Sequence, residues 1–423
     1  MPTPTFDVVI LGAGAAGSAT ARAAAQAGLS VLCVDKRPID KAGAHWINAV
    51  PTWCFEQAGV PMPTGPELRK VSHRTTMVAG WGPTHVRFPA TGMLDVDMAL
   101  LIQRLRDDAR AAGARFQERV SVRQVTRAPG ANQIHTDQGD FIARTVVDAT
   151  GIGGLGLLRL PDSQPHVCAA AQQQRKLVDR QAALRFLADN NAEEGDNLIF
   201  SAIEGGYSIV NICVEGDEVG LLTGSVPALG RPPGHTILER FAEQQPWIGA
   251  ALRKGAGPIP LQPPLRPALG DIAAIGDQGG HVYAMHGSSI GAAMVAGQML
   301  ARTLTDGGRA EDWGRRWMRT HGGNFAGAYL FFRFTMSMTP EELAGLMESG
   351  LLTPDRMSAG LLQKTPKIRI KDLPGVVRGA VRERRTVGKL APTLVRMGVA
   401  EALYAAYPGP QPWWESRIKK LLR

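Results

Sequence analysis

Three glycines near the start of the sequence carry its clearest chemistry. Gly12, Gly14 and Gly17 follow a short apolar run at residues 6–11 and precede a small-residue segment that continues to residue 27. The residues between the glycines are Ala13, Ala15 and Ala16. The first glycine allows a tight turn, the second lets the backbone approach a pyrophosphate, and the third lets a helix pack against a strand. Because the N–H groups at such a helix start are unpaired and lie at its positive dipole end, the pattern predicts a phosphate-binding turn.

An acidic residue stands at the distance that this chemistry requires. Residues 29–34 are typical of a second strand, and Asp35 follows it, 18 residues after Gly17. A carboxylate at this place can accept hydrogen bonds from both hydroxyls of a ribose. The neighbouring Lys36 joins it as a candidate binding residue. Strand, glycine turn, helix and acidic strand end together predict an adenine dinucleotide site.

Two later blocks repeat the pattern of an apolar strand that ends in an acidic residue and glycines. Residues 143–151 end in Asp148-Ala149-Thr150-Gly151, and residues 271–277 end in Gly276-Asp277. A long small-residue helix is expected at about residues 287–303. The three separated blocks predict one domain that is interrupted by insertions.

Together these blocks resemble the FAD-dependent oxidoreductase superfamily of p-hydroxybenzoate hydroxylase, geranylgeranyl reductases and flavin-dependent tryptophan halogenases. The resemblance covers about residues 1–330 and implies FAD as the cofactor. It implies an α/β (α+β) fold with a Rossmann-like FAD-binding domain of the glutathione-reductase and p-hydroxybenzoate-hydroxylase type. An inserted antiparallel-sheet substrate domain and a C-terminal helical, basic extension complete the expected architecture.

The expected domains follow from composition and turn residues. The discontinuous FAD-binding domain takes residues 1–48, 92–161 and 264–330, with a helix at residues 95–112. The substrate-binding domain takes residues 49–91 and 162–263, and the C-terminal basic helical region takes residues 331–423. Within the second part we expect a polar helix at residues 172–188. An antiparallel meander of strands at residues 197–203, 207–214 and 218–225 should follow, because turn residues separate these apolar runs.

The resemblance also assigns FAD contacts residue by residue. Asp277 would contact ribityl and phosphate oxygens, and Gln103 would touch the FAD phosphates or ribose. The start of the following helix would face the flavin pyrimidine edge, where its dipole stabilises negative charge at flavin N1. The residues placed there are His286, Gly287, Ser288, Ser289, Ile290 and Gly291. No metal is implied.

His286 and His45 are the candidate catalytic residues, because an imidazole near neutrality can serve as a base or a proton donor. Asn48, His281 and Tyr283 are further polar candidates for the pocket. The alternative is that these histidines only form hydrogen bonds with the backbone near FAD.

The function that these residues favour is an FAD-dependent monooxygenase. It would hydroxylate an electron-rich aromatic substrate through the C4a-hydroperoxide that reduced flavin forms with dioxygen. The substrate would be a phenol or an indole, small or peptide-bound, since the chain is also similar to flavoproteins that make tryptophan-derived quinone cofactors in peptides. Electrons would come from NAD(P)H or a separate reductase. The alternatives are a prenyl or polyene reductase like the geranylgeranyl reductases, and a non-enzymatic binding protein that has lost FAD. Halogenation is disfavoured because no Trp-x-Trp-x-Ile-Pro motif is present.

The charge of the chain is concentrated in its last fifth. The 423 residues carry a formal charge of +9, and residues 331–423 hold 16 Lys and Arg against 8 Asp and Glu. Three interpretations stay open for this region: an interfacial membrane helix, a docking surface for an acidic protein, or a basic helix packed on the FAD domain. The membrane helix would use Trp414, Ile418, Leu421 and Leu422, which fall at helical spacing. No nucleic-acid partner is expected, because no motif for one is present.

Cysteine use and hydropathy place the chain among intracellular proteins. Its four cysteines are scattered without a metal-binding spacing, which is typical of reduced thiols. No apolar stretch is long enough for a transmembrane helix, and the first apolar run lacks the basic flank of a signal peptide. The expected location is cytoplasmic, with peripheral membrane contact as the alternative.

Overall fold

The N-terminal strand lies inside an eight-stranded sheet of the computed structural model, which describes residues 3, 5–128, 131–160, 165–366 and 373–423. Its strands are β1 (Thr5–Leu11), β2 (Val31–Asp35), β6 (Arg115–Glu118), β7 (Val122–Thr126), β8 (Asn132–Thr136), β9 (Gly139–Asp148), β15 (Ala268–Leu269) and β16 (Ile272–Ala274). The main order is β15-β16-β9-β1-β2-β6, and β8 joins β7 to β9. The strands from β6 to β16 run parallel. Their carboxyl ends therefore meet at one edge, and this edge receives all three sequence blocks.

Small residues let the helices beside this sheet pack closely on one another. The helices are α1 (Ala15–Gln26), α2 (Thr52–Ala58), α3 (Met98–Ala111), α6 (Ile290–Thr305) and α7 (Ala310–Trp317). α1 contacts both α3 and α6. A Cβ on Gly297 of α6 would lie only 2.7 Å from Thr20 Oγ1 of α1, so the glycine is required for this approach. The alanine-rich face of α1 is buried in the same core.

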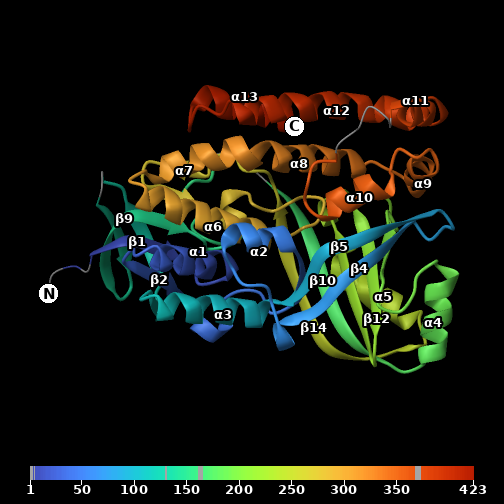
Figure 1. The fold of residues 1–423 in the computed structure, drawn as a ribbon, viewed down its shortest axis with the longest axis horizontal. Helices are drawn as coiled ribbons and strands as arrows, with labels where there is room; N and C mark the ends of the chain where they lie inside the picture. The colour runs from blue at the N-terminus through green and yellow to red at the C-terminus, as the bar shows by residue number, and fades with distance from the viewer. Residues whose placement is uncertain (1–2, 4, 129–130, 161–164, 367–372) are drawn as a thin grey trace.

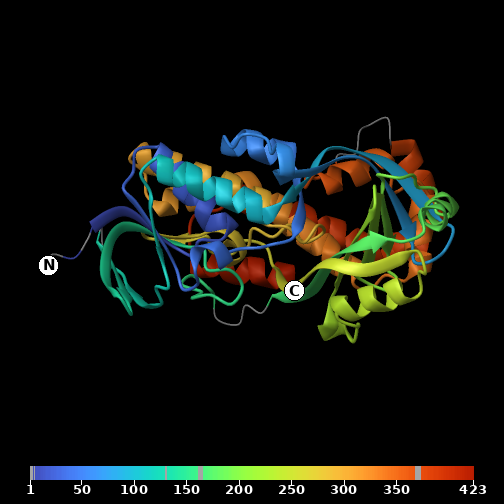
Figure 2. The same ribbon diagram turned by 90° about the horizontal axis from the view of Figure 1, so that it is seen from below.

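A second eight-stranded sheet forms the other end of the elongated molecule (Figures 1 and 2). Its strands are β3 (Ile47–Pro51), β4 (Leu68–Ala79), β5 (His85–Asp97), β10 (His166–Leu177), β11 (Asn197–Ser201), β12 (Ser208–Glu215), β13 (Glu218–Ser225) and β14 (Ile248–Leu261). The order is β14-β10-β13-β12-β11-β4-β5-β3, antiparallel except for β11 beside β4. α4 (Arg180–Asp189) and α5 (Gly234–Glu243) contribute to a core on this sheet. The predicted antiparallel meander is confirmed as β11-β12-β13.

The predicted helix at residues 172–188 is wrong in its first half, where residues 172–177 belong to β10. Glutamines that suggested a polar helix alternate here between two faces of a strand. The Gln172 amide bonds both the N–H (2.8 Å) and the carbonyl (2.9 Å) of Ile47, whereas Gln173 bonds Glu239 (2.9 Å). Tertiary partners thus decide the local structure.

The expected boundaries near residues 91 and 95 also differ from the observed elements. β5 continues through both positions to Asp97, which then caps α3 by accepting hydrogen bonds from the N–H groups of Ala99 and Leu100. The helix predicted at residues 95–112 is therefore Met98–Ala111. β5 of the second sheet therefore leads directly into α3, which packs on α1.

The C-terminal region forms a helical layer along one side of both sheets (Figure 1). Its helices are α8 (Gly323–Thr335), α9 (Pro340–Glu348), α10 (Pro354–Leu361), α11 (Leu373–Arg382), α12 (Arg384–Ala405) and α13 (Pro412–Leu422). α12 packs on α8, and α11, α12 and α13 form the outermost row. Within the described ranges, no helix combines the length and the hydropathy needed to cross a bilayer.

Most apolar side chains of α13 face the protein, whereas Trp413 is exposed. Trp414, Ile418 and Leu422 are buried, and the Trp414 ring lies 5.2 Å from that of Tyr404. Glu415 is also buried and pairs with Arg266 at 2.5 Å. Trp414, Ile418 and Leu422 therefore do not form the membrane-facing side that the sequence suggested, because the protein's own core occupies them. Membrane contact of the basic C-terminal region stays a prediction.

Candidate functional site

The glycine turn has three different steric requirements, one for each glycine. Gly12 has a φ of 102°, and a Cβ there would lie 2.4 Å from the Ala149 carbonyl oxygen. A Cβ on Gly17 would lie 1.8 Å from the Gly12 carbonyl oxygen. At Gly14 the nearest atom to a Cβ would be Gly43 Cα at 3.6 Å, which is ordinary contact. The protein itself thus requires Gly12 and Gly17, whereas Gly14 leaves space beside the start of α1 for a ligand.

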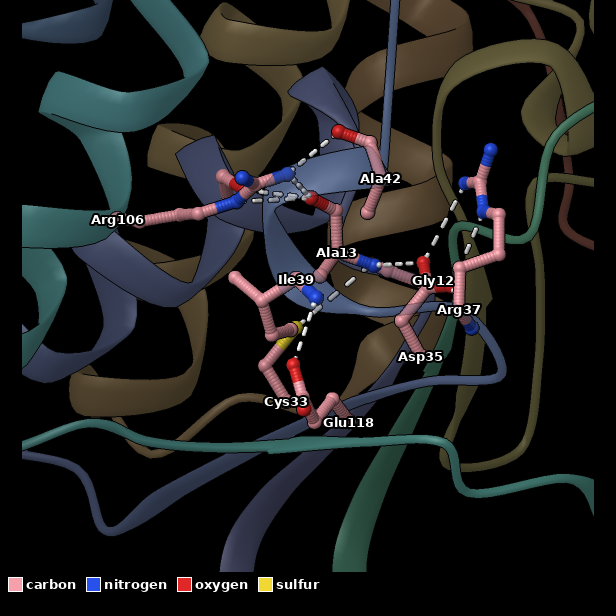
Figure 3. A network of polar contacts seen from close by, with 10 residues as sticks. Gly12, Ala13, Cys33, Asp35, Arg37, Ile39, Ala42, Arg106 and Glu118 are labelled. Carbon is pink, nitrogen blue, oxygen red and sulfur yellow. Dashed lines mark hydrogen bonds and ion pairs between the residues drawn. The ribbon is translucent and has the colours of Figure 1, made fainter.

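A buried arginine fixes this turn from the side. Arg106 of α3 donates to the carbonyl of Ala13 at 2.7 and 3.2 Å, and to the carbonyl of Ala42 at 2.6 Å (Figure 3). Its side chain is almost fully buried, and burial lowers the pKa of the guanidinium. Arg106 therefore holds the turn at Ala13 and the segment at Ala42 in place.

Gln103, the residue of this helix that was expected to touch FAD, lies on the exposed side. Its amide bonds the Asp107 carboxylate at 2.9 Å. Arg106 was missed, although the sequence held a signal for it: it is a charged residue within the apolar stripe formed by Ile102, Leu105 and Ala109. A cation on the buried face of an amphipathic helix needs partners.

Asp35 is ionised and oriented before any ligand arrives. Its carboxylate accepts from the N–H of Ala13 and the N–H of Arg37, both at 2.9 Å, and pairs with the Arg37 guanidinium at 3.2 Å (Figure 3). Burial raises the pKa of Asp35, but the hydrogen bonds from Arg37 and Ala13 outweigh it, so the pKa lies below its usual range. Lys36 is exposed beside it. The predicted ribose contact of Asp35 stays a prediction.

The three sequence blocks converge behind this turn. A Cβ on Gly276, whose φ is 74°, would lie 2.9 Å from Ala16 Cβ of α1. The Gln278 amide donates to the Gly151 carbonyl, and a Cβ on Gly151 would lie 3.9 Å from Asp277 Oδ2. The structure therefore brings together residues from near positions 16, 151 and 277, as the strand pattern predicted.

Asp277 lies where the phosphate turn meets the start of α6. Ser289, the residue before α6, donates to Asp277 Oδ1 at 3.1 Å. Burial raises the pKa of Asp277, while hydrogen bonds from Ser289 and the Ile152 backbone lower it. A cavity of about 190 Å³ lies at this carboxyl group, and Gln278, Gly279 and Gly280 also line it. A carboxylate beside such a cavity can accept further hydrogen bonds and suits a ligand with hydroxyl groups.

A tight turn precedes α6. The Tyr283 carbonyl accepts from the N–H groups of His286 (3.0 Å) and Gly287 (2.8 Å), and Tyr283 N–H donates to Ser288 at 3.0 Å. Gly287 has a φ of 67°, which favours glycine. Asn48 of β3 reaches this turn, since its Nδ2 donates to Ser288 Oγ at 3.2 Å. We call residues 283–288 the α6 turn.

Ile290 and Gly291 lie beyond this turn. Ile290 is half-buried and packs on the first core. A Cβ on Gly291 would lie 2.4 Å from Cys54 Sγ of α2. Gly291 is thus required by the packing of α6 on α2.

His286 is a half-buried, weakly basic imidazole. Burial lowers its pKa to about 4. Gln363 Nε2 lies 3.2 Å from His286 Nδ1, and because an amide nitrogen only donates, Nδ1 accepts and the neutral ring carries its proton at Nε2. Gln363 is itself buried with a φ of 59°, in the segment that follows α10. Sequence reasoning missed Gln363 because 77 residues separate it from its partner.

His45 and His281 lie apart from the α6 turn. His45 is exposed, and its carbonyl accepts from Arg253. His281 is fully buried, its Nδ1 accepts from Gly276 N–H at 3.2 Å, and its ring lies 4.5 Å from that of Trp317. Burial lowers the pKa of His281 to about 3. It serves the packing between η4 (Gly276–Gly279) and α7.

An apolar wall faces the α6 turn from the second sheet. A Cβ on Gly287 would lie 3.6 Å from Ile259 Cδ1 and 3.8 Å from Tyr207 Oη. Ala170 belongs to the same cluster, and we call Ala170, Tyr207 and Ile259 the apolar wall. Met285 of the α6 turn packs in this cluster too. Burial raises the pKa of Tyr207, and its hydroxyl forms no hydrogen bond with any residue in the described ranges. Tyr207, another residue that the sequence did not single out, is a protonated phenol directed at the α6 turn.

These residues fit a bound dinucleotide with a flavin. The turn at Gly14 leaves room for a pyrophosphate, Asp35 and Asp277 offer acceptors for sugar hydroxyls, and a cavity lies at Asp277. Helix α6 begins where a dipole would stabilise negative charge on a ring.

Comparison with known proteins gives the same indication. The profile of the FAD dependent oxidoreductase family matches residues 7–61. The chain is 23% identical to a digeranylgeranylglycerophospholipid reductase of Sulfolobus acidocaldarius, over 95% of this chain and 93% of the relative. It is 23% identical to a second such reductase, of Methanopyrus kandleri, over 81% and 90% of the two chains.

Solved structures share the whole architecture. A geranylgeranyl bacteriochlorophyll reductase-like protein of Thermoplasma acidophilum superposes with a TM-score of 0.71 at 15% identity, over 92% of this chain and all of the other. Halogenase PltM in complex with phloroglucinol and FAD superposes with a TM-score of 0.65 at 14% identity, over 99% and 95% of the two chains.

Proposed function

We propose that this chain, which has the fold and the FAD cofactor of the FAD-dependent oxidoreductases, reduces carbon–carbon double bonds in the prenyl chains of a lipid. The observation that carries the proposal is the extent of the similarity to the Sulfolobus acidocaldarius reductase, which takes in 95% of this chain. The proposal reverses the order of the alternatives favoured by the sequence alone, where hydroxylation came first.

The geometry supports a reductase more than a hydroxylase. Hydroxylation of a phenol benefits from a base beside the ring, and the two candidate bases do not fit that role. His45 is exposed, and His286, with a pKa of about 4 and Nδ1 bonded to Gln363, is a poor base near neutral pH. An alkene needs no base but an apolar surface and a proton, and the wall offers both in Ile259 and Tyr207.

The residues of the chain have distinct roles in this reaction. Bound FAD, once reduced, supplies a hydride. Ala170 and Ile259 hold an apolar chain against the α6 turn, which contributes Met285, and exclude water from it. Tyr207 keeps its proton at Oη, because burial raises its pKa, and can deliver it to the carbon that does not take the hydride. Loss of that proton would leave a buried phenolate, so the tyrosine must be reprotonated after each turnover.

The test compares two incubations of the purified holoenzyme. Under anaerobic conditions with a chemical reductant and a geranylgeranyl-bearing ether lipid, mass spectrometry should show hydrogen pairs added to the lipid. In air, with phenols or indoles, it should show no added oxygen. Oxygen insertion without any saturation would overturn the proposal and restore the hydroxylase.

A further inference from the structure

The outer face of α12 carries almost no charge although it is exposed. Between Gly388 and Ala405 eleven residues of this helix are exposed, and only Lys389 and Glu401 among them are charged. The others are apolar: Gly388, Ala391, Pro392, Leu394, Val395, Gly398, Val399, Ala402 and Ala405. Val395 is 67% exposed, Leu394 48% and Val399 45%. An exposed helix face normally carries polar side chains, so this one needs an occupant.

The opposite face of α12 is already occupied. Thr386, Ala400 and Tyr404 are buried, and Met397 packs on the third core beside α8. α12 is therefore apolar on both sides, whereas one side suffices to attach it to the protein. α11 continues the exposed apolar surface, with Val377 61% and Val381 71% exposed. These two helices lie in the outermost row of the molecule in Figure 1.

Basic residues border this surface. Arg378, Arg382, Arg384 and Arg385 are exposed where α11 meets α12. Arg378, Arg384 and Arg385 form no ion pair with any residue in the described ranges, and Arg382 has only a 3.6 Å contact with Glu348. On α13, in the same row, Arg417 and Lys420 are exposed next to Trp413, which is 56% exposed. Tryptophan beside basic residues is typical of the boundary between lipid headgroups and acyl chains.

We propose that the exposed face of α11 and α12 binds an anionic lipid bilayer, with the valines and Leu394 in the acyl boundary and the arginines on lipid phosphates. Charge favours this occupant over a second copy of the chain, since two such faces would bring like-charged arginine clusters together. The inference deepens the proposed function, because a membrane-held enzyme meets a lipid substrate where that substrate resides.

The experiment is flotation of the purified full-length holoprotein with vesicles. Vesicles of phosphatidylglycerol and phosphatidylcholine should float with bound protein. Pure phosphatidylcholine vesicles should carry at least about tenfold less protein. High salt should reduce the binding to anionic vesicles, because it screens the arginines. Flotation needs no turnover, so the surface and the proposed reaction can fail independently.

Two variants locate the surface. Val395→Asp with Val399→Asp, and Arg384→Glu with Arg385→Glu, should each lower binding to anionic vesicles by about tenfold or more. The matched control is Val178→Asp with Leu252→Asp, which changes residues that are 56% and 58% exposed on the second sheet, and it should bind like the unchanged protein. Flavin content and circular dichroism should be the same in all variants, since every changed residue is at the surface.

Three results would overturn the proposal. One is an unchanged protein that does not float with anionic vesicles. Another is a Val395→Asp, Val399→Asp variant that floats as well as the control. The third is light scattering that shows a dimer which this variant turns into a monomer, because the face would then be an interface between two copies.

Discussion

Asp35 and Asp277 lie far apart in the sequence and meet at the cofactor site, where they have different hydrogen-bond partners. Asp35 accepts hydrogen bonds from Ala13 and Arg37, whereas among the described residues the partners of Asp277 are Ser289 and a backbone N–H. Removal of either carboxylate should weaken FAD binding about 10- to 100-fold, since a hydrogen bond to a charged group contributes about 1.5–3 kcal/mol.

Fluorescence titration of apoprotein checks Asp35→Ala and Asp277→Ala against Asp40→Ala, whose carboxylate is exposed close to Asp35. The first two variants should lose affinity and the third should keep it. Unchanged affinity in both would contradict the assignment of these carboxylates to the cofactor.

Tyr207 is the residue through which the reductase proposal is most directly testable. Tyr207→Phe should slow saturation of the lipid about 100-fold, because a positioned acid contributes about 10²–10⁴ to a rate, while FAD content stays the same. Tyr329→Phe is the matched control, since its hydroxyl contacts His166 at 3.2 Å rather than the α6 turn. Equal turnover in both variants would show that a group other than Tyr207 donates the proton.

These residues also show what the sequence could predict. Gly12, Asp35 and Asp277 stand at fixed spacings after strands, so parallel pairing places them at one edge without further information. Tyr207, Gln363 and Arg106 act through contacts between residues 64 or more positions apart. The apolar stripe around Arg106 signals that it is buried, but no local pattern encodes which partners these residues have.

At the scale of elements, two glycines at the start of α1 have different roles: one leaves space for a ligand and the other is needed for the helix to pack. Gly14→Ala adds a Cβ that the protein can accommodate but that occupies the ligand space, so the variant should remain folded and lose flavin. Gly17→Ala places a Cβ 1.8 Å from a backbone oxygen, so α1 must move off β1. Overpacking of this kind costs about 1–3 kcal/mol or more.

Urea unfolding of the two apoproteins measures this difference. We expect Gly14→Ala to unfold at the midpoint of the unchanged protein and Gly17→Ala at a clearly lower one. If both midpoints fall equally, the space at Gly14 is not reserved for a ligand.

Elements were predicted well where a strand or helix carries its own periodicity, as in β1, β12, β13 and α6. The prediction failed at β10, because Gln172 and Gln173 form hydrogen bonds with Ile47 and Glu239 rather than with solvent. Burial of polar side chains through specific hydrogen bonds hides a strand from pattern reasoning.

At the scale of the whole molecule, buried histidines should make stability depend on pH. Burial lowers the pKa of His286 and His321 to about 4 and that of His281 to about 3. The unfolded chain protonates these rings below about pH 6.5, whereas the folded chain leaves them neutral, so the unfolded state binds more protons. Stability should therefore fall as the pH drops from about 6.5 toward 4, by up to about 1.4 kcal/mol per pH unit for each histidine.

Urea midpoints measured between pH 7 and pH 5 check this dependence. His281→Asn should reduce the loss of stability at low pH by the contribution of one histidine. A profile that is flat in the unchanged protein would show that the rings take up protons within the fold.

The order in which strands enter the first sheet has a consequence for synthesis on the ribosome. β1 pairs with β9 and β9 with β16, so the sheet edge that holds the dinucleotide is assembled from segments that end at residues 11, 148 and 274. A nascent chain that already displays the glycine turn still lacks Asp277 and α6. FAD can therefore bind only after about two thirds of the polypeptide has emerged from the ribosome. Flavin would then stabilise a chain whose first sheet is already assembled, rather than start its folding.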